Sequence, residues 1–296
     1  MVYARRFVYA VLTAMAATSA AADRSVRTSQ RHELVRPSGQ DLTVKNLNSD
    51  NVGVANIPRG GKNVVKSTPF VSQSASILMG LILALNSGFI NGCALSGAVT
   101  VDGSSQAVAA VTASWTNSAL GLASGNMAKF GFLGKVLGSF IFGSLIAGYL
   151  EPRPAPFLVS TSSFGLPLTI AAGFMVIAKM FLEDASSVRL GFYLLAMANG
   201  INNSVTSTMT SNLCRTSHFS GISSDMGTFL GQILRGNKAN MFKLKVFAGL
   251  SACFWAGGYL SYSLSKSYGT STLYVSAAIY LFMAGAYDKV AKSMFA

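Results

Sequence analysis

The stretch ASILMGLILALNSGFINGCALSG, residues 75–97, decides the fold class of this chain. It carries no charged side chain, and it reaches the roughly 20 residues that a helix needs to cross a bilayer. Similar apolar runs follow near 132–150, 164–182, 188–206, 242–264 and 271–288. Lipid offers no partners to backbone polar groups, and the runs lack the alternation of barrel strands, so we predict that all of them are helices.

Two further segments, 105–123 and 217–234, are more polar, and each is open to three interpretations: a full span, a half-span or an interfacial helix. The predicted fold class is therefore all-α, a polytopic helical membrane protein with six to eight spans. The composition agrees with a membrane protein. Of the 296 residues, 51% are hydrophobic and only 11% are charged, less than half of the roughly 25% that is usual in soluble proteins.

The net charge of the chain is +13, which raises the question of a nucleic-acid partner. Ten of the 23 lysines and arginines fall in residues 1–70, and the other 13 are spread along the apolar remainder without a basic stripe. We therefore expect no nucleic-acid partner and take the lipid bilayer as the main one. The cysteines Cys93, Cys214 and Cys253 form no CxxC pair and have no histidine cluster nearby, so we expect no disulfide framework, metal site or cofactor.

Residues 1–22 have the layout of an N-terminal targeting segment, with two arginines, an apolar run and small residues that end at Ala22. This layout fits a secretory signal peptide, while the further arginines up to Arg36 fit an organellar transit peptide. Residues 23–70 are polar and basic without hydrophobic periodicity, and we predict a disordered arm there. The helical membrane domain is then residues 71–290.

Short words recur within this domain at a nearly fixed distance. GFIN at 88–91 matches GINN at 200–203 with an offset of 112, and GYL at 148–150 matches GYL at 258–260 with an offset of 110. Three shorter matches lie between them at offsets of 110 or 111: Leu120-Gly121 with Leu230-Gly231, Gly125-Asn126 with Gly236-Asn237, and Lys135-Val136 with Lys245-Val246. The words predict an internal repeat of two halves, about 75–182 and 188–288, a plan that is common in secondary transporters. The halves are inverted if each crosses an odd number of times.

The positive charges predict the orientation. With eight spans, nine lysines and arginines share the side of the termini and three lie opposite; with six spans the division is eight to four. Both counts place the C-terminus on the cytosolic or matrix-like side. A cleaved secretory signal would instead leave residue 23 in the lumen. The choice between an endomembrane or plasma membrane and an organellar membrane therefore stays open.

The words NSGFINGCALSG and RTSHFSGISSDMGTFLGQILRG resemble the YoaK-like family of bacterial multi-span membrane proteins, a domain family without an established function. The resemblance covers about residues 74–290. Arg215, Thr216, His218, Ser220 and Gly221 fall on the family pattern Arg-Thr-x-His-x-Thr-Gly, with serine in place of threonine. Asn91 stands where the family carries an aspartate, and SWTNS at 114–118 replaces a Met-Thr-Gly-Asn word. The resemblance implies an architecture and no chemistry.

Residues 215–236 contain the first group of candidate site residues. The apolar side chains of 222–234 repeat at helical spacing, which is sufficient for a structural helix beside the membrane. In the functional interpretation, Arg215, His218 and Asp225 face a cavity between the halves and bind an anion or relay a proton, because ionisable groups at membrane depth are costly unless they are used or paired.

Asparagines in corresponding helices of the two halves form the second group. Asn86 and Asn91 lie in the first half, and Asn199, Asn202 and Asn203 lie in the second. One interpretation is cross-helix hydrogen bonding. The other is a polar substrate site, for which Asn91, Asn202 and Asn203 are the candidates.

The sequence contains no catalytic motif in a usable context, so we do not expect an enzyme. The first hypothesis is a small-solute transporter or permease-like protein that binds a small polar or anionic solute at the repeat interface. The alternative is a non-transporting membrane scaffold or partner-binding subunit, in which glycine-rich helix faces pack against a second copy or another membrane protein.

Overall fold

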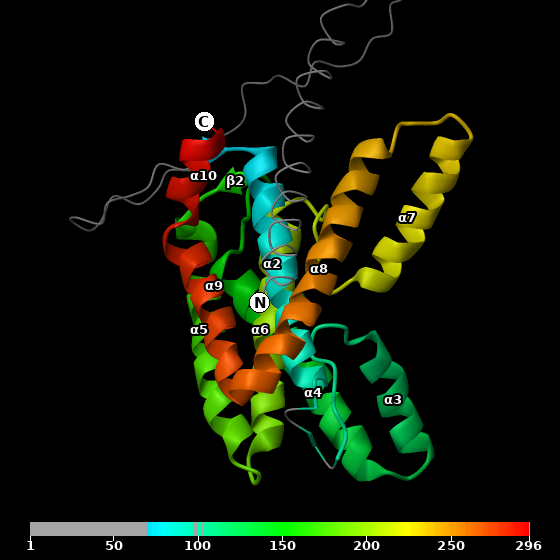
Figure 1. The fold of residues 1–296 in the computed structure, drawn as a ribbon, viewed down its shortest axis with the longest axis vertical. Coiled ribbons are helices and arrows are strands. Elements are labelled where there is room, and N and C mark those ends of the chain that lie inside the picture. Colours follow the sequence, from blue (N-terminus) through cyan, green and yellow to red (C-terminus); the bar gives the residue numbers. More distant parts are fainter. Residues whose placement is uncertain (1–69, 98–99, 102, 296) are drawn as a thin grey trace, which may run out of the picture.

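The computed structural model describes residues 70–97, 100–101 and 103–295. The predicted targeting segment at 1–22 lies outside the described residues, as does all but the last residue of the predicted arm at 23–70. The described chain consists mainly of helices (Figure 1). In chain order the elements are β1 (Phe70–Val71), α2 (Gln73–Leu95), α3 (Thr112–Ala123), α4 (Met127–Leu150), β2 (Leu158–Val159), α5 (Thr161–Glu183), α6 (Val188–Met209), α7 (Phe219–Leu234), α8 (Met241–Tyr268), the 3-10 helix η1 (Gly269–Thr272), α9 (Leu273–Gly285) and α10 (Tyr287–Phe295).

Each apolar run of the predicted membrane domain forms a helix, as predicted. The six long runs correspond to α2, α4, α5, α6, α8 and α9. The more polar segments form the shorter helices α3 and α7, of 12 and 16 residues. At about 1.5 Å per residue they extend roughly 18 and 24 Å, which is less than the roughly 30 Å of a bilayer core. Neither helix therefore crosses a bilayer as a single straight span.

Three of the described helices, α2, α4 and α5, are long and apolar enough to cross a membrane. The number rises to four if the bent pair Met241–Gly285 and Tyr287–Phe295 counts as one span. The predicted six to eight spans are therefore not confirmed. Helix α6 has 22 residues but carries three asparagines in its second half, and α9 has only 13 residues. The protein is a helical membrane protein in which part of the bundle is too polar or too short to be recognised as a span alone.

The helices run between two ends of the molecule. At the strand end, β1 pairs antiparallel with β2, and the amide of Phe157 donates to the carbonyl of Met209 at 2.7 Å. Helices α2 and α5 therefore begin where α4 and α6 finish. At the η1 end, the Thr270 hydroxyl donates to Glu183 at 3.0 Å, so α9 begins beside the end of α5. Helices α2, α5 and α8 run one way and α4, α6 and α9 run the other (Figure 1).

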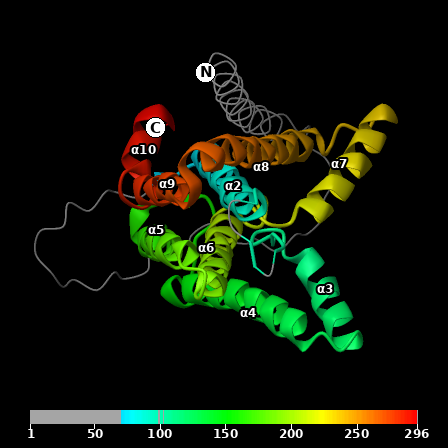
Figure 2. The same ribbon diagram turned by 60° about the horizontal axis from the view of Figure 1, so that its bottom comes forward.

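Helices α2 and α6 contact each other in the middle of the bundle. Helix α2 packs along α8, while α6 packs along α4 and α5, and α5 also packs along α9 (Figure 2). The short helices lie at the periphery, α3 against α4 and α7 against α8. Each outer helix, α4 or α8, thus packs against a central helix from the other half of the sequence.

Glycine permits these close approaches between helices. A Cβ atom on Gly88 of α2 would lie 2.0 Å from the carbonyl oxygen of Phe254 in α8. A Cβ atom on Gly200 of α6 would lie 2.1 Å from the carbonyl oxygen of Phe140 in α4. Small residues at helix contacts allow backbones to touch in this way, which is typical of membrane bundles.

Apolar side chains occupy the outside of the bundle as well as its core. Phe89, Phe192 and Met175 are buried, while Ile141, Phe142 and Leu145 of α4 are exposed. Other large exposed apolar side chains lie on α5, α8 and α9: Leu166, Val176, Ile177, Met180, Trp255, Tyr259, Val275, Leu281 and Phe282. Contiguous exposed apolar surface is unfavourable in water but favourable in lipid, so these faces contact the bilayer.

Candidate functional site

The middle of the bundle, where α2 meets α6, is polar. The Ser87 hydroxyl of α2 lies 2.8 Å from Oδ1 of Asn199 in α6 and 3.1 Å from the carbonyl oxygen of Thr216, and these two acceptors share its single proton. All three residues are buried. Hydrogen bonds are stronger in a low-dielectric interior, so this group ties α2 to α6 and to the loop before α7.

Two more buried amides lie at this contact and are incompletely paired. The Asn202 amide nitrogen donates to the carbonyl of Leu83 at 3.0 Å, but its Oδ1 has no partner among the described residues. Both amide atoms of Asn86 likewise have no partner in the described part of the chain. Each such buried atom costs about 1–3 kcal/mol. The contact therefore offers three unpaired hydrogen-bonding atoms to a polar ligand.

Tyr280 of α9 adds a phenol to these amides. Its hydroxyl lies beside the side chains of Asn86 and Asn202 without a hydrogen bond to either, and it lies 3.5 Å from the carbonyl oxygen of Ala198. Asn86, Ser87, Asn199, Asn202 and Tyr280 are here named the central polar cluster. All five are buried, and none carries a charge at neutral pH. The cluster therefore suits a small uncharged solute that forms hydrogen bonds.

A buried polar stripe connects the cluster with the η1 end. Thr272, Ser276 and Tyr280 follow one another at intervals of four residues, so they share one face of the helical segment. The hydroxyls of Thr272 and Ser276 are buried and have no partner among the described residues. Hydroxyls of this kind provide a row of hydrogen-bonding groups along α9.

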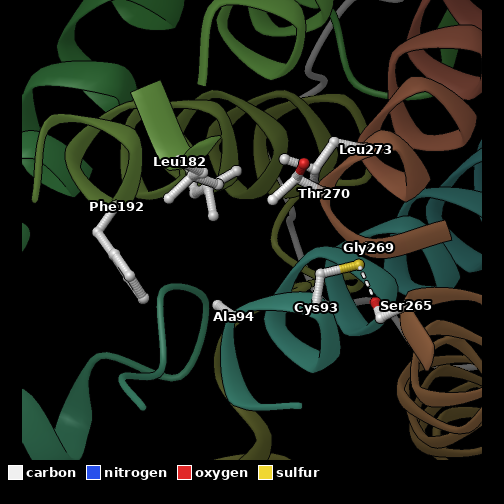
Figure 3. Close-up of a pocket in the computed structure, with 9 residues that line it drawn as sticks. Cys93, Ala94, Leu182, Phe192, Ser265, Gly269, Thr270 and Leu273 are labelled. Atoms are coloured by element: carbon white, nitrogen blue, oxygen red, sulfur yellow. Dashed lines mark hydrogen bonds between the residues drawn. The ribbon is translucent and has the colours of Figure 1, made fainter. Parts of the chain in front are cut away.

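A small pocket lies at the η1 end, beside the start of this stripe (Figure 3). Its cavity volume of about 10 Å³ is roughly room for one water molecule. The Ser265 hydroxyl donates to the sulfur of Cys93 at 3.5 Å, as the dashed line in Figure 3 shows. The lining residues come from α2, α5, α6, α8, η1 and α9: Cys93, Ala94, Leu182, Phe192, Leu195, Ser265, Gly269, Thr270 and Leu273.

A second pocket lies at the strand end, with a cavity volume of about 30 Å³. It is formed where α4 ends, α5 begins and α6 ends. Its polar lining residues are Glu151, Ser163, Ser204 and Thr208, and the others are apolar or small: Ala147, Gly148, Pro154, Ala155, Leu158, Phe164, Pro167, Val205 and Met209. Burial raises the pKa of the Glu151 carboxyl above its ordinary value.

The predicted asparagines fall into two groups. Oδ1 of Asn91 accepts from the backbone amides of Val108 and Ala109, at 2.9 and 3.0 Å. Oδ1 of Asn203 accepts from the amide of Ser217 at 3.2 Å. Both side chains therefore hold the loop that leads to a short peripheral helix, and only Asn202 of the predicted three belongs to the central polar cluster.

The charged candidates lie away from this cluster. Arg215 is half-buried in the loop before α7, His218 is exposed and lies over Gly221, and Asp225 is exposed on α7. No salt bridge joins these three side chains to any part of the chain that the structure describes. The same part contains no group of three or more histidine, cysteine and acidic residues that could hold a metal ion.

Sequence reasoning missed Tyr280 and Glu151. The available signal for Tyr280 was its four-residue spacing from Ser276 and Thr272 within an otherwise apolar run. Glu151 was recognisable as the one acidic residue between Asp102 and Glu183, directly after an apolar helix. Neither signal predicts which side chains they meet, because those contacts come from other helices.

Comparison with known proteins identifies one family. A family model described as "Protein of unknown function (DUF1275)" matches residues 79–286, which is most of the described membrane domain. No curated protein and no solved structure matches the chain. The match therefore supplies a family and no activity.

Proposed function

The chain belongs to the DUF1275 family of proteins of unknown function, and we propose that it is a small-solute transporter whose binding site is the central polar cluster. The observation that carries this proposal is the pair of buried, incompletely paired amides of Asn86 and Asn202 where α2 meets α6. Polar groups within a membrane bundle are costly, and they are retained where they bind a solute or pair with one another.

The proposal includes an inverted repeat of the halves 75–182 and 188–288. Helix α2 then corresponds to α6, α4 to α8, and α5 to α9. The two members of each pair run in opposite directions between the strand end and the η1 end, which supports inversion over a parallel repeat. In secondary transporters with inverted repeats, the substrate site lies near the midplane where the repeats meet.

Reciprocal glycine contacts support the same correspondence. Gly88 and Gly200 are 112 residues apart, and the residues they touch, Phe140 and Phe254, are 114 apart. The contact of Gly88 with Phe254 thus becomes the contact of Gly200 with Phe140 when the halves are exchanged.

A second pair of contacts follows the same rule. A Cβ atom on Gly257 would lie 2.0 Å from the carbonyl oxygen of Leu85, and one on Gly143 would lie 2.0 Å from that of Met197. The offsets are again 114 between the glycines and 112 between their partners. Four contacts that obey two fixed offsets are difficult to explain without a repeat.

In the proposed repeat, α4 and α8 have a register that differs from the one predicted by the words in those helices. The words Lys135-Val136 and GYL match their counterparts in α8 at an offset of 110. The glycine contacts between the helices instead give an offset of 114, which is four residues more. The turn before α4 has three residues, 124–126, whereas the turn before α8 has six, 235–240. The three additional residues change the offset from 111 at Gly125 and Gly236 to 114 in the helices that follow.

The asparagines and Ser87 also occupy related positions. Ser87 and Asn199 are 112 residues apart and bond to each other, as expected of corresponding residues beside a pseudo-two-fold axis. Asn91 and Asn203 are also 112 apart, and each accepts hydrogen bonds from the loop before a short helix. The central polar cluster therefore lies where the two halves meet.

Flux measurements in proteoliposomes test the proposal. We would follow the uptake of urea, acetamide and glycerol, three small uncharged solutes, by stopped-flow light scattering. The double variant Asn86→Leu and Asn202→Leu removes the unpaired amides, and we expect at least one of these fluxes to fall about tenfold, which corresponds to roughly 1.4 kcal/mol at the barrier.

The matched control is Asn117→Leu, which makes the same chemical change on the peripheral helix α3, where Asn117 is half-buried and away from the cluster. This variant should keep the wild-type flux. Equal flux in the double variant, the control and the wild type would reject the site. Flux no faster than in protein-free liposomes would reject transport of these solutes.

A specific observation favours the alternative function as well. Gly227 and Gly231 of α7 face open space, and Leu230 and Leu234 of the same helix are exposed. A small-residue face of this kind is suited to close packing against another membrane helix. A non-transporting scaffold would copurify with a stable partner and show no solute flux, so the liposome experiment also separates the two functions.

A further inference from the structure

The pocket at the strand end has a lining that differs in chemistry from the central polar cluster. Its polar side chains are those of Glu151, Ser163, Ser204 and Thr208, so oxygen is the only polar atom type that side chains contribute. No lysine, arginine or histidine belongs to the lining. The pocket therefore combines one carboxylate with several neutral oxygen ligands.

Two oxygen groups of the lining residues, a backbone carbonyl and a hydroxyl, are short of hydrogen-bond partners. Pro167 lies inside α5 and has no N–H to donate to the carbonyl of Ser163, which is four residues earlier. The Ser204 hydroxyl donates to no group in the described part of the chain. Hydroxyl and carbonyl oxygens beside a carboxylate are the ligands that hard cations prefer.

Among the described residues, no neighbouring side chain balances the charge of Glu151. Arg153, two residues later, is exposed and does not line the pocket. Asp288 accepts a hydrogen bond from Thr161 at the start of α5 and also lies outside the lining. No residue of α6 that lines the pocket is titratable. A partly buried carboxylate without a counter-charge is unfavourable, and a bound cation would remove that cost.

We infer that the strand-end pocket is a binding site for a small monovalent cation of the Na⁺ type, with Glu151 as its anionic ligand and the oxygens of Ser163 and Ser204 as neutral ligands. The single carboxylate favours a single positive charge. The cavity volume of about 30 Å³ admits such an ion with roughly one water molecule and excludes a larger organic cation.

The pocket at the η1 end provides an internal comparison, which rests on the inverted repeat proposed above. At the offset of 114, the residue that corresponds to Glu151 is Ser265, and Ser265 is engaged with Cys93. That pocket has no carboxylate in its lining and one third of the volume. Of these two pockets, both lined by described residues, only the one at the strand end therefore has the ligands for a cation.

Thermal unfolding of the detergent-solubilised full chain tests the inference. The melting temperature is measured at pH 8 in NaCl and in N-methyl-D-glucamine chloride of equal ionic strength. A ligand that binds only the folded state stabilises it, so we expect Na⁺ to raise the melting temperature by about 3 °C. The variant Glu151→Gln should lose this difference.

The control variant is Glu183→Gln, which removes an exposed carboxylate that pairs with Lys179 at the other end of the molecule. It should keep the Na⁺ response even if its melting temperature is slightly lower. Glu151→Asp covers the case in which Glu151→Gln does not fold, because it retains the charge; the Na⁺ concentration for half of the effect should then rise severalfold.

The response should also depend on pH. Protonation removes the anionic ligand, so the Na⁺ effect should shrink as the pH is lowered into the range in which carboxylates take up protons. A Na⁺ response that is absent in the wild type, or equal in Glu151→Gln, overturns the inference. Because stability is measured here and not flux, failure of this test is independent of the transport proposal.

Discussion

At the residue scale, two pairs of asparagines have different roles in this fold. Asn91 and Asn203 accept hydrogen bonds from loop backbones, whereas Asn86 and Asn202 retain unpaired atoms where α2 meets α6. The sequence predicts that such amides need partners, but it cannot distinguish these roles because the partners are far along the chain. Asn91 meets residues 17 and 18 positions away, and Asn202 meets one 119 positions away.

The role of Asn91 leads to a stability prediction. The YoaK-like pattern carries an aspartate at this position, and a carboxylate would accept the same two hydrogen bonds from Val108 and Ala109. We expect Asn91→Asp to retain the wild-type stability within about 1 kcal/mol. Asn91→Leu leaves two buried backbone amides unpaired and should lower the free energy of unfolding by about 2 kcal/mol or more. Denaturant titration followed by tryptophan fluorescence measures both changes, and equal losses in the two variants would contradict this role.

At the element scale, the positions of the helices along the chain could be predicted from the sequence, while their packing in the bundle could not. The six apolar runs coincide with α2, α4, α5, α6, α8 and α9, since lipid or a buried core requires long stretches without charge. The words Gly125-Asn126 and Gly236-Asn237 mark turns, because both glycines have positive φ, at 73° and 89°. The charges of Arg215, His218 and Asp225 make them candidates in the sequence. In the structure they lie in the loop before α7 and on α7 itself, away from the contact between α2 and α6.

Helix contacts at glycine lead to a second stability prediction. Alanine at Gly88 or Gly200 would place a methyl group 2.0 or 2.1 Å from a backbone carbonyl oxygen, and backbone cannot rotate away as a side chain can. We expect each variant to lower the free energy of unfolding by about 1–3 kcal/mol, the usual effect of overpacking.

Gly138→Ala on α4 is the matched control for these variants. Gly138 faces open space, so the same substitution there adds helix propensity without a clash and should raise stability slightly. The same denaturant titration compares the three variants. A stability of Gly88→Ala and Gly200→Ala equal to that of the control would show that these helices do not touch at glycine.

At the scale of the whole molecule, the distribution of charge agrees with one of the two predicted arrangements. The strand end carries Arg153, Arg235, Lys238, Lys243, Lys245, Lys289 and Lys292, and the η1 end carries Lys129, Lys135, Lys179, Arg189 and Lys266. The eight-span arrangement would have placed Lys129, Lys135 and Arg189 on the side of the C-terminus, whereas they lie at the end of the bundle opposite to α10. We propose the six-crossing arrangement, with the strand end on the cytosolic or matrix-like side.

The inverted repeat is the central claim, because the position of the site and the comparison of the two pockets both depend on it. In that arrangement the turn between α3 and α4 lies at the η1 end, and its counterpart between α7 and α8 lies at the strand end. Ser124 and Lys238 are exposed in these two turns. The native cysteines Cys93, Cys214 and Cys253 are buried, so they should react little with a thiol reagent.

Labelling of single cysteines with a membrane-impermeant maleimide therefore tests this claim most directly. Ser124→Cys, Ser186→Cys and Lys238→Cys would be labelled in sealed vesicles of uniform orientation, before and after permeabilisation. Ser186 is exposed in the turn between α5 and α6, so it should share the side of Ser124. The account predicts that Ser124→Cys and Ser186→Cys react from one side of the membrane and Lys238→Cys from the other. Reaction of Ser124→Cys and Lys238→Cys from the same side would contradict it.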